Sequence, residues 1–462
     1  SDVCSSDLFF LMKRIKILCL FLVLCFMANF AACTSASQSV SSSSESQQES
    51  TPQEDGTDPQ KVAEVTVWHV WGSGEQAAAF EEALKIFEDK YPNIKIEATA
   101  FEPDAFQVQG LKTAVAANDF ADVTHAWIGS QSQPFVESGK LMCLDEYLTD
   151  DVMAQLLPGA LDGFTYNDKV YGLPYVAYTT IMLYNQKLFD QYDLAIPETY
   201  DDLVSVCQTF LDNDITPLCL GGKELWTTMI YYDIMAIRYM GLDSVKTALS
   251  GGAFERDDWL ACTKKFSELV EIDAFGENAA TLGRYEVEQE FKMGKIPMLV
   301  EGSWVLSDVY TPDNSVVKES MVLAPFPIMS DGKGKATETL GMVNDGWVMN
   351  ASAAHPDKAF IVMTELMHTM SDINYSTGIN APAWVVSEDV DTSNVSPAIS
   401  EVKSILENSS NSMPFWDGFL NADRTTSHKN ALQALVAKTM TPEEFVDRSE
   451  ERRVGKECRS RW

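Results

Sequence analysis

The chain has 462 residues, of which 45% are hydrophobic, so it is long enough for about two or three ordinary domains with apolar cores. Its 34 Lys and Arg residues stand against 68 Asp and Glu residues, which gives a formal charge of −34 at pH 7. Binding to DNA, RNA or an anionic lipid surface needs clustered Lys and Arg to neutralise phosphate. The composition therefore argues strongly against nucleic-acid binding.

The first part of the chain has the pattern of a secretory leader. A short basic segment, Met12–Lys16, precedes an unbroken apolar run from Ile17 to Ala28. Such a run is too short for a comfortable membrane span and typical of the core of a signal peptide. We therefore predict a signal peptide over residues 12–32.

The leader closes on Phe30-Ala31-Ala32-Cys33, which resembles a bacterial lipobox. The resemblance implies cleavage before Cys33 and a lipid on its thiol; an ordinary signal peptide with an incidental Cys is the alternative. Residues 33–60 are rich in Ser, Gln and Thr and poor in apolar side chains, so they are predicted to form a flexible tether. Together these segments predict a lipid-anchored protein on the extracellular face of the cell membrane, or on the periplasmic side in a Gram-negative cell.

The two extreme ends look foreign to the rest of the chain. Residues 1–11 precede the natural-looking start at Met12, and residues 449–462 are basic in an otherwise acidic protein. Both resemble translated sequencing-adapter text. We expect that neither belongs to the natural protein.

Four of the nine cysteines lie in the body of the chain, namely Cys143, Cys207, Cys219 and Cys262. They form no CxxC pair and have no His nearby in metal-ligand order. Four buried thiols are the favoured interpretation, with a Cys207–Cys219 disulfide as the alternative. No metal site and no cofactor is predicted.

The body opens with alternating strand and helix patterns. Val65–Trp71 and Asn93–Ala98 have strand composition, and the short apolar segment Asp122–Trp127 reads as a third strand. Apolar residues at helical spacing follow Glu75, and a second helical pattern covers about Pro103 to Asn118. This order predicts right-handed crossovers and a largely parallel, doubly wound α/β sheet.

Sheets of this kind bind ligands beyond the carboxyl ends of their strands. The loops Trp71–Glu75 and Trp127–Gln131, together with the segment around Tyr178, are therefore the first places to expect a site. Further amphipathic helices are predicted at residues 257–270 and 356–367. No linker interrupts residues 61–448, which favours one large two-lobed unit.

The sequence contains no specific catalytic constellation. There is no HExxH, GxSxG or Walker A motif, and the five His residues are widely scattered. Two of the many carboxylates could meet in a cleft and resemble a glycosidase pair, but the sequence does not pick out such a pair. The prediction is a protein that is not an enzyme.

Several Trp residues follow a strand or a Gly-containing turn. An indole ring offers flat apolar area to the C–H face of a sugar, while planar Asp, Asn, Gln and Arg groups suit its hydroxyls. A core role is the alternative for each of them. The residues in question are Trp71, Trp127, Trp226, Trp304 and Trp347.

The body of the chain resembles a known family, the extracellular solute-binding proteins of family 1. These proteins are sugar-binding components of bacterial ABC importers and include the maltose-binding proteins. The agreement runs in order from about Val65 to Asp447. The segments that carry it are Val67–Gly72, Phe87-Glu88, Tyr91–Ile94, Ala121–Val123, Phe135–Leu144, Lys169–Tyr175, Leu183–Asn185, Leu188-Phe189, Ile196–Leu203, Phe291, Gly294-Lys295, Met298, Gly302–Trp304 and Thr441–Glu444.

The resemblance implies a two-lobed α/β fold of the type II periplasmic-binding-protein class, with a ligand cleft between the lobes. Lobe I is predicted from residues 61–176 plus 327–380, and lobe II from residues 177–326 plus 381–448. By position, the implied ligand-binding residues are Trp71, Glu75, Trp127, Ser130, Gln131, Tyr178, Trp226, Trp304, Asp345, Trp347, Trp416 and Arg424.

The implied function is a non-catalytic, monomeric receptor that captures a carbohydrate, expected to be an oligosaccharide, and delivers it to a membrane permease. Two alternatives stay open. One is a receptor for a cationic solute such as a polyamine, which the negative charge and the aromatic residues would suit. The other is a surface glycoside-active enzyme.

Overall fold

The computed structural model describes residues 62–157, 159–310, 314–393 and 395–453. The predicted signal peptide, Cys33, the tether and residues 1–11 lie outside these ranges. So does most of the segment 449–462, although the last helix, α18 (Pro442–Arg453), continues into it. Each of these predictions stays a prediction.

The first lobe contains a five-stranded sheet in the order β2-β1-β3-β11-β6. Its strands are β1 (Ala63–His69), β2 (Ile94–Ala100), β3 (Val123–Trp127), β6 (Gly172–Pro174) and β11 (Asp345–Met349). As predicted, β1 is parallel to both β2 and β3. The sheet is nevertheless mixed, because β11 lies antiparallel between β3 and β6.

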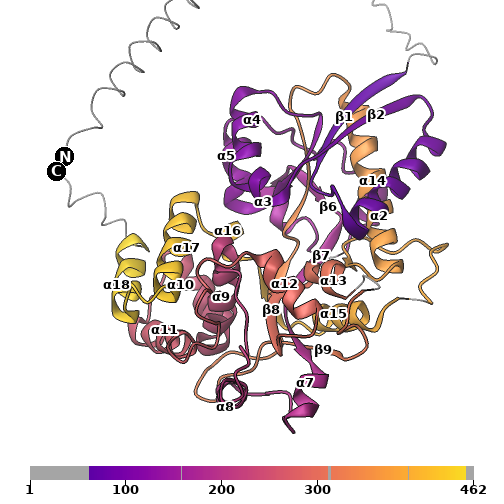
Figure 1. Cartoon of the computed structure of the whole chain (residues 1–462). Coiled ribbons are helices and arrows are strands. Elements are labelled where there is room, and N and C mark those ends of the chain that lie inside the picture. The colour runs from indigo at the N-terminus through magenta and orange to yellow at the C-terminus, as the bar shows by residue number, and fades with distance from the viewer. Residues whose placement is uncertain (1–61, 158, 311–313, 394, 454–462) are drawn as a thin grey trace, which may run out of the picture. The chain divides into compact units, whose positions relative to one another are not determined.

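Helices α2 (Gly74–Lys90) and α14 (Pro356–Ser376) pack on this sheet and on each other (Figure 1). The buried side chains of α2, among them Phe80, Ala83 and Phe87, recur every three or four residues, so one face of the helix is apolar. The segment from Pro103 to Asn118, predicted as helical, contains α3 (Pro103–Ala105), a π-helical turn (Phe106–Gly110) and α4 (Leu111–Ala117). Pro103 and the capping carboxylate of Glu102 fix the start of this segment.

The second lobe is built around β7 (Val176–Asn185), which is rich in β-branched and aromatic residues and almost wholly buried. It pairs antiparallel with β8 (Met298–Gly302), β9 (Met321–Ala324), β10 (Glu338–Met342) and β12 (Ala381–Pro382). β13 (Asn411–Met413) extends the sheet beside β10.

A group of helices covers one part of this lobe (Figure 1): α9 (Trp226–Met240), α10 (Leu242–Leu249), α11 (Arg256–Glu271), α17 (Ala422–Val436) and α18. α9 lies at its centre, and nearly all of its side chains are buried. The remaining α-helices and β-strands of the described residues are α5 (Gln133–Glu137), α6 (Asp150–Met153), β4 (Thr165–Tyr166), β5 (Lys169–Val170), α7 (Gln186–Gln191), α8 (Tyr200–Leu211), α12 (Arg284–Lys292), α13 (Leu306–Val309), α15 (Pro397–Glu407) and α16 (Trp416–Phe419).

One strand departs from the predicted division of the chain. β10 falls inside the segment 327–380 that we assigned to lobe I, yet it pairs with β7 and β13 of the second sheet. The chain returns to the first lobe only between Met342 and Asp345, where β11 begins. Among the described residues, no helix combines the length and apolar character that a membrane span needs.

Candidate binding site

Two adjoining cavities lie where residues of both lobes meet. The inner cavity encloses about 660 Å³ of empty space and the outer cavity about 1470 Å³, including space open to solvent. Five residues line both cavities and mark the neck between them: Val70, Pro103, Arg284, Trp304 and Asp345. The inner cavity is further lined by Asp104, Gln107, Trp127, Trp226, Phe415 and Asp417, and the outer one by Trp71, Glu75, Glu102, Tyr175 and Asp308.

Trp304 is the central aromatic side chain of the second lobe's wall. Its ring centroid lies 5.3 Å from the ring of Tyr178, 5.7 Å from Trp226 and 5.3 Å from Phe415. The indole passes directly over Gly302 at the end of β8, where a Cβ atom would lie 2.2 Å from the Trp304 ring. A glycine is thus required at position 302, because the Trp304 ring lies too close to leave room for a side chain. The neighbouring aromatic rings hold the indole at the neck.

The first lobe supplies aromatic groups from the ends of its strands. Trp127 closes β3 and lines the inner cavity, while Trp71 follows β1 and lines the outer one. Between them lies buried His125, whose ring meets both indoles edge-on, at 4.8 Å and 5.7 Å. Trp347 is fully buried behind Trp71, at 5.9 Å between centroids. The cavities are therefore flanked by large rings from both lobes.

Asp345 carries a buried carboxylate at the neck. One of its oxygens, Oδ2, lies 3.1 Å from His125 Nε2, and Oδ1 has no hydrogen-bond partner among the described residues. This carboxylate also acts on two neighbouring phenols, although burial is the larger reason why the pKa values of Tyr175 and Tyr178 lie well above the usual range. Both phenols are consequently neutral, and their hydroxyls share a hydrogen bond of 2.5 Å.

Arg284 opens α12 and faces Asp345 from the second lobe. Its Nη1 donates to buried Glu288 at 2.7 Å, and its guanidinium lies 5.5 Å from the Trp226 ring. Burial raises the pKa of Glu288 to about 8 against the lowering effect of Arg284, and it raises the pKa of Glu301 to about 7. The guanidinium of Arg284 therefore lies near two carboxyl groups, those of Glu288 and Glu301, that burial shields from water.

The direct contacts between the two lobes include two polar ones. At the inner cavity, Trp226 Nε1 donates to Asp104 Oδ1 at 3.3 Å, and Arg284 Nε lies 3.8 Å from Asp104 Oδ2. At the second contact, Ser130 Oγ donates to the backbone carbonyl of Asp417 at 2.7 Å. This geometry is that of a cleft closed between two lobes.

The sequence pattern of the bacterial extracellular solute-binding proteins matches residues 71–364, which is more than half of the chain. The chain belongs to this family. A solved structure from work on xylan utilization by the thermophilic bacterium Caldanaerobius polysaccharolyticus is 33% identical, with a TM-score of 0.80 over 84% of this chain and 99% of that one. The family resemblance and the two-lobed fold predicted from the sequence are confirmed.

Two curated relatives come from archaea. An uncharacterized ABC transporter extracellular-binding protein of Pyrococcus horikoshii is 25% identical over 71% of this chain and 74% of its own length. The maltotriose-binding protein of Pyrococcus abyssi is 26% identical over 58% of this chain and 55% of its own length. The relatives are binding proteins, and the extracellular placement that the sequence predicts agrees with the family.

For this solute-binding protein, most of the residues predicted as ligand-binding come together. Trp71, Glu75, Trp127, Trp226, Trp304 and Asp345 line the two cavities. Tyr178 lies behind Trp304 and Trp347 behind Trp71. Ser130 and Gln131 form the 3₁₀ turn at the second contact between the lobes. Whether each side chain binds ligand stays a prediction.

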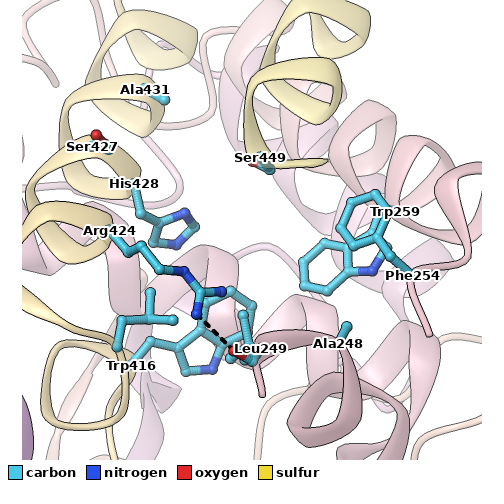
Figure 2. Close-up of a pocket in the computed structure, with 11 residues that line it drawn as sticks. Ala248, Leu249, Phe254, Trp259, Trp416, Arg424, Ser427, His428, Ala431 and Ser449 are labelled. Atoms are coloured by element: carbon cyan, nitrogen blue, oxygen red, sulfur yellow. Dashed lines mark hydrogen bonds between the residues drawn. The ribbon is translucent and has the colours of Figure 1, made fainter. Parts of the chain in front are cut away.

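Trp416 and Arg424 lie elsewhere, in a separate pocket of the second lobe (Figure 2). Arg424 and His428 project from α17 above Trp416, with Phe254 and Trp259 on the other side of the pocket. Arg424 Nη1 donates to the carbonyl of Leu249 at 2.8 Å, and the Trp416 and His428 rings stack at 5.1 Å. Both predicted residues therefore pack the helical group rather than the cleft, because α16 turns the Trp416 ring toward α17.

Other residues that line the cleft were not predicted: Asp104, Gln107, Arg284, Asn344, Phe415 and Asp417. None of them carries a sequence signal of its own, since they are common polar or apolar residue types in loops and at helix starts. Only the adjacency of Asn344 to Asp345, and of Phe415 and Asp417 to Trp416, could have suggested a place near the site. In the part of the chain that the structure describes, no group of three or more His, Cys, Asp or Glu side chains could hold a metal ion.

Proposed function

We propose that this protein is the substrate-binding component of an ABC importer and that it captures a carbohydrate between its two lobes. The observation that carries the proposal is the inner cavity, which Trp127 and Trp304 from opposite lobes line together with Asp345 and Arg284. Indole faces suit the C–H surface of a sugar ring, and carboxylate and guanidinium groups suit its hydroxyls. The named relatives include a maltotriose-binding protein, which supports this ligand class.

Binding works by lobe closure in this proposal. Each lobe supplies part of the site, so a sugar binds the closed form more tightly than the open form and shifts the population toward closure. The protein performs no reaction on the sugar. A permease in the membrane recognises the closed, loaded form and receives the sugar.

The leader and Cys33 support a further part of the proposal, which concerns placement in the cell. A lipid on Cys33 would hold a monomeric receptor at the outer face of the membrane, and the Ser-rich segment 33–60 would let it reach the permease.

Thermal unfolding of the mature protein tests the ligand class, with xylotriose, maltotriose and spermidine as separate additions. A ligand that binds only the folded protein raises the melting temperature with rising concentration. We expect a rise with one of the trisaccharides, which is then recovered intact by chromatography. A rise with spermidine alone would replace the ligand class, and cleavage of the sugar would end the receptor proposal.

A further inference from the structure

The charges that line the two cavities are strongly unbalanced. The acidic residues are Glu75, Glu102, Asp104, Asp308, Asp345 and Asp417. Among the described residues that line either cavity, Arg284 is the one basic side chain. A ligand that enters the cleft therefore meets mainly negative charge.

The positive charge of Arg284 is already engaged by the protein. Its Nη1 is 2.7 Å from Glu288 Oε1, and its Nε is 3.8 Å from Asp104 Oδ2. Behind the inner cavity, Lys429 likewise pairs with Asp417 at 2.8 Å. Each of these cations therefore already lies beside a carboxylate that lines the inner cavity, Asp104 for Arg284 and Asp417 for Lys429.

Closure adds to the imbalance in the outer cavity, because it brings together carboxylates from both lobes. Glu75 lies in the first turn of α2, and Asp308 lies in α13, which contacts α2. Burial raises the pKa of Asp308, so its charge is already poorly hydrated. Asp345 Oδ1 is buried at the neck without a hydrogen-bond partner among the described residues. Hydroxyl groups of a ligand can donate to such oxygens, whereas a carboxylate on the ligand cannot.

We propose that the outer cavity is a charge filter, which admits neutral or cationic sugar units and rejects sugar acids such as uronates. This inference rests on the proposed function and narrows its substrate class. Glu75 and Asp308 are the residues that set the filter, since they face the outer cavity from opposite lobes. A like charge a few ångströms away costs enough at the effective dielectric of a protein surface to weaken binding by about tenfold or more.

Matched oligosaccharides test the filter by calorimetric titration of the mature protein. The first set is xylotriose, xylotriose with a neutral arabinosyl branch and xylotriose with a methylglucuronosyl branch. The second set is maltotriose and maltotriose oxidised to a uronic acid at one terminal C6. We expect the acidic member to bind about tenfold more weakly than its neutral counterpart, and less so at high salt.

Two double variants separate the filter from general charge effects. In the double variant Glu75→Gln with Asp308→Asn, the affinities for the neutral and the acidic ligand should differ by about threefold or less. Glu81→Gln with Glu82→Gln removes two exposed carboxylates from α2 that do not line the cavities, and it should leave the wild-type difference unchanged.

Each other outcome has a definite meaning. Equal binding of neutral and acidic members would overturn the filter and leave the carbohydrate receptor intact. If both branched xylotrioses bind equally weakly, and maltotriose and its uronic acid bind equally well, the cavity selects ligands by size and not by charge. Failure of both neutral trisaccharides to bind would contradict the proposed function, and the filter would fall with it.

Discussion

Gly129 of the first lobe lies so close to Gly418 of the second lobe that a Cβ atom on Gly129 would be 1.4 Å from the Gly418 carbonyl oxygen. Gly129 also has a φ of +62°, which favours glycine. Next to this contact, Ser130 Oγ reaches the carbonyl of Asp417. The closed form therefore depends on the absence of a side chain at position 129.

We expect Gly129→Ala to hinder closure, because closure must then displace backbone. The affinity for the trisaccharide identified by thermal unfolding should fall by about tenfold or more. Gly139→Ala is the matched control. Gly139 has a φ of +67° but nothing within 4 Å of its added Cβ, so it shares the backbone strain, about 1–2 kcal/mol, without the contact. Titration calorimetry compares the two; equal losses of affinity would refute the role of the contact.

Gly302→Ala should act through Trp304. The backbone at Gly302 is extended, with φ −72° and ψ 152°, and tolerates Ala, but the new Cβ would overlap the indole. We expect a loss of about 1–2 kcal/mol in sugar binding, because the ring leaves its position at the neck. In a Trp304→Ala background the same substitution should cost little more, so the effects will not add. Additive losses in this double-mutant cycle would show that Gly302 acts independently of the ring.

The buried carboxyl of Glu301 predicts a specific pH dependence of stability. Burial raises its pKa to about 7, from an ordinary value of 4.5, against the lowering effect of Arg284. The folded protein therefore holds a proton that the unfolded chain has released, and the stability from this group, complete below the ordinary value, falls as the pH rises from about 4.5 through about 7.

We expect Glu301→Gln to flatten this fall and to make the protein about 1–3 kcal/mol more stable than wild type near pH 8. The Gln carbonyl can still accept from the Gly302 N–H, which Glu301 Oε1 now accepts at 3.1 Å. Urea unfolding at several pH values measures the difference. An unchanged pH profile would mean that Glu301 is ionised in the folded protein.

The thiols give a chemical check on the second lobe. Cys207, Cys219 and Cys262 are free and buried, while Cys143 is partly exposed. Burial raises the pKa of Cys207 to about 12 and that of Cys219 to about 11, so the reactive thiolate is scarce at neutral pH. Of these four, iodoacetamide should label only Cys143 in the native protein and all of them after denaturation, as read by peptide mass spectrometry. A Cys207–Cys219 disulfide would instead protect both until reduction.

The fold could largely be predicted from the sequence where local patterns are strong. The β1 and β3 strands follow from their strand-like composition and the α2 helix from apolar residues at helical spacing. Trp71 and Trp127 were found because they follow or end a strand. Arg284 and Asp104 could not be found in this way. They are 180 positions apart, lie on different lobes and meet only when the cleft closes, so neither residue has a local pattern that marks it.

Trp416 and Arg424 lie outside the cleft for a different reason. The predicted cleft positions near the end of the chain depended on spacing across gaps, and a short helix such as α16 (Trp416–Phe419) can present a ring to either side. In the structure the neighbouring Phe415 faces the inner cavity, while Trp416 packs against His428. A shift of one residue decides which aromatic ring a ligand would meet.

The place of β11 in the first sheet has a consequence for how the chain acquires its structure. This strand, Asp345–Met349, fills the gap between β3 and β6, and it comes after the second-lobe strands β7, β8, β9 and β10 in the chain. During synthesis, or after threading through an export channel, β3 and β6 wait with unpaired edges until a segment more than 200 positions beyond β3 arrives. Long-range pairing of this kind slows folding and leaves the waiting edges open to aggregation. The first sheet thus cannot be completed before the second-lobe segment from β7 to β10 has been made.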